Sequence, residues 1–200
     1  MAHMLRTMPV PSNVGEPSLV PVPEERPPNM VVFGQPGTEN NIYREPWGAL
    51  SASVVETLGI QGIIDIGTRK TAPPRLVGPA PVTTMGQLAP DRVSRDLVSC
   101  RFGLLNYDIA RLQKSGVFAA YAAHGVIPIC IGSQAKPPLG LEEGQHFLRW
   151  PPKGMPDLGM MQRKLAQWYG DHSTVKHADI LASWCRSERG VNRTDNAMSA

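Results

Sequence analysis

Cysteine is scarce in this sequence, and the spacing of the few present excludes the usual cysteine-based sites. The 200 residues contain three cysteines, at positions 100, 130 and 185, and no two of them form a CxxC pair. An odd number of widely spaced cysteines argues against a disulfide framework and favours a reducing compartment. The five histidines form no HExxH or similar cluster, so the sequence predicts no zinc site.

Long apolar runs and basic clusters are also missing. No apolar run approaches the ~20 residues that span a bilayer. Residues 1–10 lack the hydrophobic segment of a signal peptide, so we expect a cytoplasmic protein without a membrane span. The net charge of +3 is spread along the chain. Because no Lys/Arg stripe with interleaved aromatic residues occurs, we expect no nucleic-acid partner.

The composition is that of a globular chain with a proline-rich start. Hydrophobic residues make up 42% of the sequence and charged residues 18%, which is enough apolar surface for one core. Residues 1–29 hold seven prolines, which fix φ and remove amide donors, so we expect an extended linker or arm there. Residues 30–188 are expected to form the folded domain, and the polar residues 189–200 a flexible tail.

Between these ends, short apolar runs alternate with stretches of helical periodicity. The runs are continuous rather than alternating, which is typical of strands buried on both faces. With helices between them, they predict right-handed βαβ crossovers and a single α/β domain with a doubly wound parallel sheet, Rossmann-like in architecture. Strands are expected at 30–33, 62–67, 82–86, 102–105 and 126–131, and helices at 47–58, 90–98, 115–123, 158–169 and 174–184.

In such a sheet, ligands bind at the loops that follow the carboxyl ends of the strands. One such loop, residues 34–38, begins with Gly34 after the first predicted strand. Its glycines would let backbone amides approach a ligand closely, although an ordinary turn uses the same residues. The loop is a candidate site, with a simple turn as the alternative.

The second candidate loop, residues 106–117, follows the fourth predicted strand. Lys114 and Ser115 stand where a helix begins. The amides of Ser115, Gly116 and Val117 are therefore expected to point outward and attract phosphate. Lys114 adds a positive charge, and Gly116 removes a side chain that would block the approach. Alternatively, Ser115 only caps the helix and Lys114 is a solvated charge; local chemistry favours neither explanation.

Four further residues have a structural explanation beside the functional one. Tyr107 either stacks on a base or caps the core, and the sequence does not separate the two. His124 follows a helix of small residues, where a histidine serves as a dipole partner more often than as a catalyst. Glu142 and Glu143 are adjacent and do not face a common point, so we expect exposed loop charges rather than a catalytic pair.

Several segments occur in a recognisable order: 85–88, 91–94, 102–105 and 114–129, the last containing Gly125-Val126-Ile127-Pro128-Ile129. This order resembles the C-terminal, nucleotide-sugar-binding domain of GT-B glycosyltransferases of the family 4 or group 1 type. In that family a helix ends in glycine before a G-x-P-(V/I) strand. The resemblance extends over residues 9–185, and the order and spacing of the segments carry it.

The resemblance implies that Lys114, Ser115, Gly116 and Val117 bind the diphosphate of a nucleotide sugar such as a UDP- or GDP-sugar. It places Gly34 near the phosphates or the sugar, and Gly86 and Tyr107 near the nucleoside. It implies neither a metal nor another cofactor. The positions aligned with two glutamates of retaining members hold Leu112 and Ala120, so the resemblance supplies no catalytic carboxylate pair.

The resemblance covers only the donor-binding half of such a glycosyltransferase and does not include the acceptor-binding half. Transfer needs the acceptor hydroxyl held against the anomeric carbon, in a cleft between two domains. We therefore expect nucleotide-sugar binding but poor transfer, unless a separate acceptor-domain chain or self-association completes the site. The alternative is a non-catalytic remnant or interaction module that keeps the half-fold. Another Rossmann-like nucleotide enzyme is less favoured, because the sequence has no GxGxxG after a strand and no GxxxxGK[ST] loop.

Overall fold

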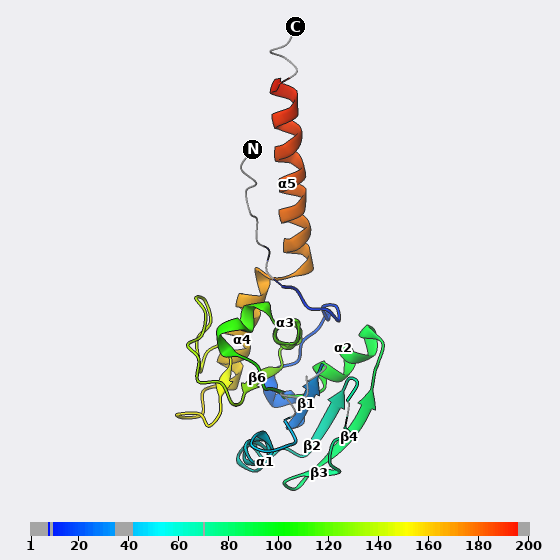
Figure 1. The fold of residues 1–200 in the computed structure, drawn as a ribbon, viewed down its shortest axis with the longest axis vertical. Coiled ribbons are helices and arrows are strands. Elements are labelled where there is room, and N and C mark those ends of the chain that lie inside the picture. Colours follow the sequence, from blue (N-terminus) through cyan, green and yellow to red (C-terminus); the bar gives the residue numbers. More distant parts are fainter. Residues whose placement is uncertain (1–7, 9, 35–41, 70, 196–200) are drawn as a thin grey trace.

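The strands of the protein lie side by side in one twisted sheet (Figure 1). The computed structural model describes residues 8, 10–34, 42–69 and 71–195. Among these residues the strand order is β3-β4-β2-β1-β5-β6-β7. All neighbouring strands are parallel except β3 and β4. The strands are β1 (Asn29–Phe33), β2 (Gly62–Ile66), β3 (Leu76–Val77), β4 (Ala80–Gly86), β5 (Phe102–Leu105), β6 (Ile127–Cys130) and β7 (Leu148–Arg149).

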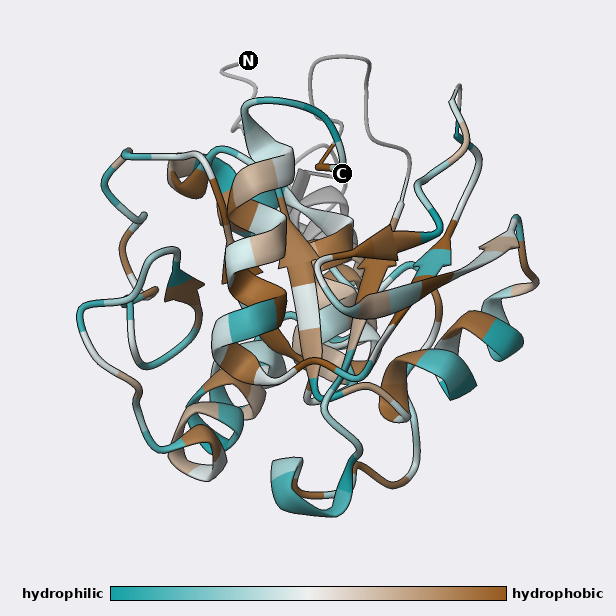
Figure 2. Cartoon of the chain, turned by 90° about the horizontal axis from the view of Figure 1, so that it is seen from below, coloured by the Kyte–Doolittle hydropathy of each residue, from teal (hydrophilic) through white to brown (hydrophobic). Residues whose placement is uncertain are grey.

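Helices cover both faces of this sheet, which confirms the predicted Rossmann-like α/β fold. The helices are α1 (Trp47–Leu58), α2 (Pro90–Val98), α3 (Gly116–Ala123), α4 (Leu158–Gly170) and α5 (Thr174–Asp195). α1 buries Val54 and Val55 in a cluster with Met30 and Val32, whereas Val31 joins the cluster formed by α2 and α3. Successive side chains of β1 thus pack on opposite faces of the sheet. Hydrophobic residues accordingly follow the strands and the helix faces that meet them (Figure 2).

The chain leaves the centre of the sheet in two directions. From β1 it passes through α1 to β2, on one side, whereas β5 lies on the other side of β1 and leads through α3 to β6. The boundary between β1 and β5 is therefore the topological switch point. In open α/β sheets the crevice at the carboxyl ends of the strands flanking this point is the usual ligand site.

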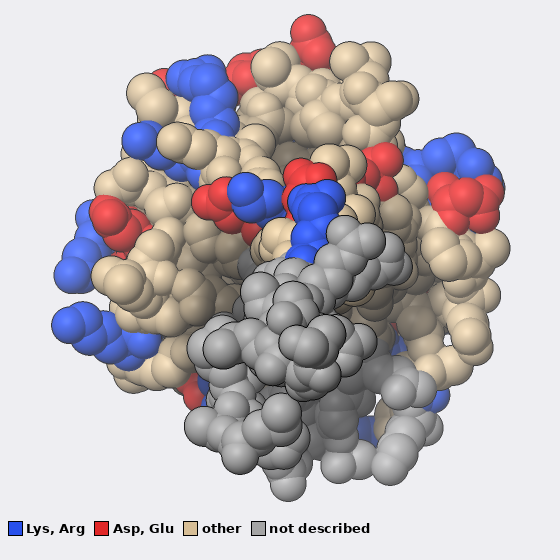
Figure 3. Space-filling view, turned by 90° about the horizontal axis from the view of Figure 1, so that it is seen from above, with Lys and Arg blue, Asp and Glu red and all other residues tan. Residues whose placement is uncertain are grey.

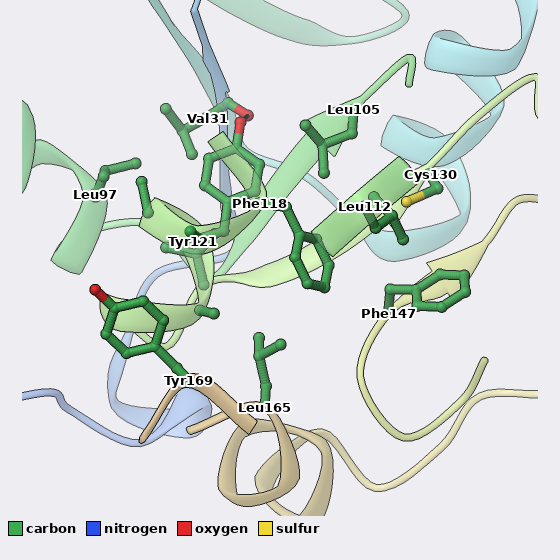
Figure 4. Packing of buried hydrophobic residues seen from close by; sticks show 14 of the residues in the cluster. Val31, Leu97, Leu105, Leu112, Phe118, Tyr121, Cys130, Phe147, Leu165 and Tyr169 are labelled. Carbon is green, nitrogen blue, oxygen red and sulfur yellow. Dashed lines mark hydrogen bonds between the residues drawn. The ribbon is translucent and has the colours of Figure 1, made fainter. Parts of the chain in front are cut away.

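Tyr121 fastens α3 to the two strands at the switch point. Its hydroxyl accepts a hydrogen bond from Phe33 N at 3.2 Å and lies 3.3 Å from the carbonyl oxygen of Leu104. The hydroxyl also lies 3.3 Å from the carbonyl oxygen of Val31, and Figure 4 shows the ring pointing toward Val31. The ring occupies the space that Gly103 leaves, because a Cβ there would lie 2.5 Å from Tyr121 Cε2. Tyr121 is fully buried, and burial raises the pKa of its hydroxyl. The start of α3 is thus held at a fixed position relative to the strand ends.

The described part of the proline-rich segment packs against the domain. Val14 is buried in the core cluster of α3 and α4. Arg26 is 3% exposed and donates to the carbonyl oxygens of Pro21 and Cys100. At the other end, α5 continues to Asp195, past the predicted helix end at residue 184, and projects away from the rest of the domain (Figure 1).

Candidate functional site

A cavity of about 290 Å³ opens at the carboxyl ends of β1 and β5, at the switch point. Phe33 at the end of β1 and Gly34 directly after it border the cavity, as do Leu104 and Leu105 of β5. Six of the seven residues proposed from the sequence border this one cavity: Gly34, Tyr107, Lys114, Ser115, Gly116 and Val117.

The start of α3 forms one wall of the cavity. Ser115 is the N-cap, and its Oγ accepts a hydrogen bond from Phe118 N at 3.1 Å. The amide of Ser115 donates to the Leu112 carbonyl at 3.0 Å, so the expectation that this amide is free is wrong. The amides of Gly116 and Val117 have no acceptor among the described residues. Two backbone donors, rather than three, are available at the cavity.

A short 3₁₀ helix (Ile109–Lys114) delivers Lys114 to the cavity wall. Ile109 and Leu112 are fully buried and anchor this helix. The Asp108 side chain caps it by accepting from Ala110 N at 3.1 Å. Lys114 itself is exposed and has no ion-pair partner in the part of the chain that the structure describes. Its ammonium is therefore available to an anion at the helix start.

Gly34 directly follows β1, where the chain meets the start of α3. Its φ is +108°, a region that favours glycine, and a Cβ there would lie 3.0 Å from Val117 Cγ2. The Gly34 amide donates to the Ile66 carbonyl at 3.1 Å. The other residues of the predicted glycine loop, 35–38, lie outside the described residues.

Gly86 lies apart from the cavity. It ends β4, which is separated from β1 by β2. The carbonyl of Gly86 accepts from the amide of Gly67 at 2.8 Å, and Gly67 in turn abuts Gly34, since a Cβ on Gly67 would lie 2.4 Å from Gly34 O. A nucleoside contact at Gly86 stays a prediction.

Sequence reasoning missed a buried ion pair beside the cavity. Asp65 is fully buried at the end of β2, and Arg69 Nε donates to its Oδ1 at 2.9 Å. The Tyr43 hydroxyl donates to the same carboxylate, and Arg69 Nη1 donates to the Gly34 carbonyl. Burial first, and then the Asp65 charge, raise the pKa of Tyr43. The signal in the sequence was an aspartate inside an otherwise apolar strand with an arginine four residues later.

His124 is the C-cap of α3, is fully buried and does not border the cavity. Its Nδ1 is 2.7 Å from the Ala120 carbonyl, and its Nε2 is 2.8 Å from Ser94 Oγ. Because a carbonyl only accepts, Nδ1 carries the proton and Nε2 accepts from the serine. Burial lowers the pKa of His124. The residue joins two helices.

The two glutamates considered as a catalytic pair, Glu142 and Glu143, do not border the cavity either. Glu143 pairs with Arg149 at 2.8 Å, and Glu142 accepts from Gln145. The positions aligned with the family's glutamates, Leu112 and Ala120, are fully buried in the core.

No three His, Cys, Asp or Glu side chains gather as a metal site within the described residues. In the same part of the chain, no helix combines the length and apolar content needed to cross a bilayer. On the face seen in Figure 3, positive and negative side chains are interspersed rather than segregated.

The sheet order and the two helical layers define a Rossmann-like α/β domain, with the cavity at its switch point. The fold of this chain is similar to the crystal structure of TarM, a GT-B glycosyltransferase, with a TM-score of 0.51 and 11% sequence identity. The superposition covers 86% of this chain and 36% of the TarM chain, so this chain spans about a third of that protein. At this identity the likeness shows the fold alone. No family model and no curated protein matches the sequence.

Proposed function

We propose that this domain is the nucleotide-sugar-binding half of a GT-B glycosyltransferase and that the cavity holds the diphosphate of the donor. The observation that carries the proposal lies at the switch point: among the described residues, the amides of Gly116 and Val117 have no acceptor and the adjacent ammonium of Lys114 has no ion-pair partner. Backbone donors at a helix start and the helix dipole both favour an anion, by about 0.3–2 kcal/mol for each charged group. Tyr107 borders the same cavity and offers a ring face to the nucleoside.

The shape of the site fits donor binding better than complete catalysis. The cavity is formed at one edge of a single sheet, whereas glycosyl transfer requires an acceptor hydroxyl positioned against the sugar. The superposition covers only 36% of TarM. We therefore propose that transfer requires an acceptor-binding domain in addition to these residues.

Calorimetric titration of the full chain with UDP-, GDP- and ADP-sugars tests the proposal. We expect binding of at least one of them, weakened about tenfold or more by Lys114→Ala, because a charged hydrogen bond is lost. Lys136→Ala is the matched control, since Lys136 is an exposed lysine that does not border the cavity. Equal affinities for the wild type and both variants would reject the site, as would no binding at all.

A second candidate is a nucleotide-binding module without transferase activity. It is favoured by the burial of Leu112 and Ala120, because apolar side chains occupy both positions where the resemblance would place carboxylates. The two candidates differ in one measurement. Hydrolysis or transfer of a bound donor, with or without an added acceptor domain, would be seen only for a transferase.

A further inference from the structure

Two buried nitrogen atoms beside the cavity lack hydrogen-bond acceptors. They are Arg69 Nη2 and Asn106 Nδ2, and neither has a partner among the described residues. Both residues border the cavity. A buried donor without an acceptor is costly, so such groups are rare and call for an explanation. Donors at a cavity wall are satisfied when a ligand brings oxygen acceptors to them.

Arg69 and Asn106 follow the two strands that lie on either side of β1, Arg69 three residues after β2 and Asn106 directly after β5. In the β1–β5 register Val32 faces Leu104, and Gly34 and Asn106 each lie two residues beyond this pair and border the same cavity. Arg69 Nη1 donates to the Gly34 carbonyl, so the guanidinium lies over the end of β1 from the β2 side. Arg69 and Asn106 therefore flank Gly34 from its two sides.

Arg69 is held in a fixed orientation. Its side chain is 7% exposed, and Nε donates to both oxygens of Asp65, at 2.9 and 3.2 Å. The hydroxyl of Tyr43 donates to the same carboxylate. Asp65 thus binds the Nε edge of the guanidinium, and Gly34 accepts from Nη1. A guanidinium anchored on these groups keeps the Nη2 donors for a planar or multi-oxygen acceptor.

The start of α3 is close to Arg69, because Val117 of α3 and Arg69 both contact Gly34. Val117 Cγ2 would lie 3.0 Å from a Cβ on Gly34, whose carbonyl accepts from Arg69. The cavity consequently has donors on two walls: the amides and ammonium of α3 on one, and the Arg69–Asn106 pair on the other. An orthophosphate at α3 would satisfy only the first wall.

We propose that Arg69 and Asn106 form a second oxyanion site, which binds the further phosphate of a diphosphate whose first phosphate lies at the start of α3. The inference rests on the proposed function and deepens it. It assigns selectivity for a diphosphate over a monophosphate to two residues in the segments that follow β2 and β5. Asp65 acts as a positioning residue for Arg69.

Competition between inorganic pyrophosphate and orthophosphate tests this assignment directly. Binding of each to the full chain is measured by calorimetry for the wild type, Arg69→Lys and Asn106→Leu. Lysine keeps the charge beside Asp65 but removes the fork of donors, and leucine keeps the size of asparagine without donors. We expect each variant to lose about tenfold or more in pyrophosphate affinity while orthophosphate affinity changes less than about twofold.

Two controls separate this assignment from the proposed function. Lys114→Ala is expected to weaken both anions, because it acts at the α3 wall, and its failure to do so would count against the proposed function alone. Arg111→Lys is the matched arginine control, since Arg111 is exposed and does not border the cavity. Unchanged pyrophosphate affinity in Arg69→Lys and Asn106→Leu overturns the second oxyanion site, as does an equal loss for both anions or a wild type that does not prefer pyrophosphate. Urea unfolding of each variant is measured to check that the variant still folds.

Discussion

Gly34 and Val117 approach so closely that a Cβ on the glycine would lie 3.0 Å from Val117 Cγ2. This contact sets the distance between the end of β1 and the start of α3, the two elements that carry the proposed donors. Because Gly34 also has a φ of +108°, an L-side chain there meets both backbone strain and a steric clash.

Gly34→Ala is therefore expected to destabilise the protein by about 2–4 kcal/mol, since backbone strain of about 1–3 kcal/mol adds to the displaced contact. Urea unfolding followed by circular dichroism measures the change. Gly59→Ala is the control, because Gly59 has a φ of +60° with no atom near its would-be Cβ. Its cost is expected to be about 1–2 kcal/mol, from the left-handed backbone alone. A Gly34 variant no less stable than the Gly59 variant would contradict the close contact.

The Tyr121 hydroxyl links the stability of the fold to the geometry of the cavity. Tyr121→Phe leaves the amide of Phe33 without its acceptor, which is expected to cost about 1–3 kcal/mol in unfolding free energy. Because Phe33 borders the cavity, we also expect weaker nucleoside diphosphate binding. Tyr169→Phe is the control: its hydroxyl binds Glu16 and Ser12, away from the cavity. If both variants bind equally well, Tyr121 has no role in the site.

His124 makes the fold sensitive to acid. Burial lowers its pKa below the ordinary 6.5, and the nearby Arg26 charge acts in the same direction, whereas the Ala120 carbonyl and Glu16 oppose it. Between the lowered value and 6.5 the unfolded chain binds more protons than the folded one. The contribution of His124 to the free energy of unfolding is therefore complete above pH 6.5. It is lost as the pH falls from 6.5 through the pKa of His124 in the folded state.

The pH dependence of the unfolding free energy, measured between pH 8 and pH 5, checks this sign. His124→Gln is expected to reduce the loss of stability on acidification. A residual slope remains, because burial also lowers the pKa values of His146 and His172. An identical slope in the wild type and the variant would show that His124 does not titrate as its surroundings indicate.

Most of the fold follows from the periodicity of the sequence. The continuous apolar runs predicted the five central strands, and α1 and α2 begin and end where the pattern placed them. β3 and β7 were not predicted because two residues are too few to show any period. α5 continues past residue 184, where the apolar spacing that marks a helix gives way to polar residues that still permit one.

The site was only partly predictable. Local chemistry at residues 114–117 indicated a helix start, and strand order then brings Gly34 and Tyr107 to the same cavity. The contribution of Arg69 depends on a tertiary contact, the hydrogen bond to Gly34 O across two strands, which no local pattern encodes. Ser115 N was expected to be free because the sequence does not show the 3₁₀ helix that gives it an acceptor.

The most direct test of the central claim is a crystal structure of the full chain with whichever of UDP, GDP and ADP binds most tightly. We expect diphosphate oxygens within hydrogen-bond distance of Gly116 N and Val117 N, with the Lys114 ammonium alongside. A diphosphate bound at another place, with these two amides left to solvent, would contradict it.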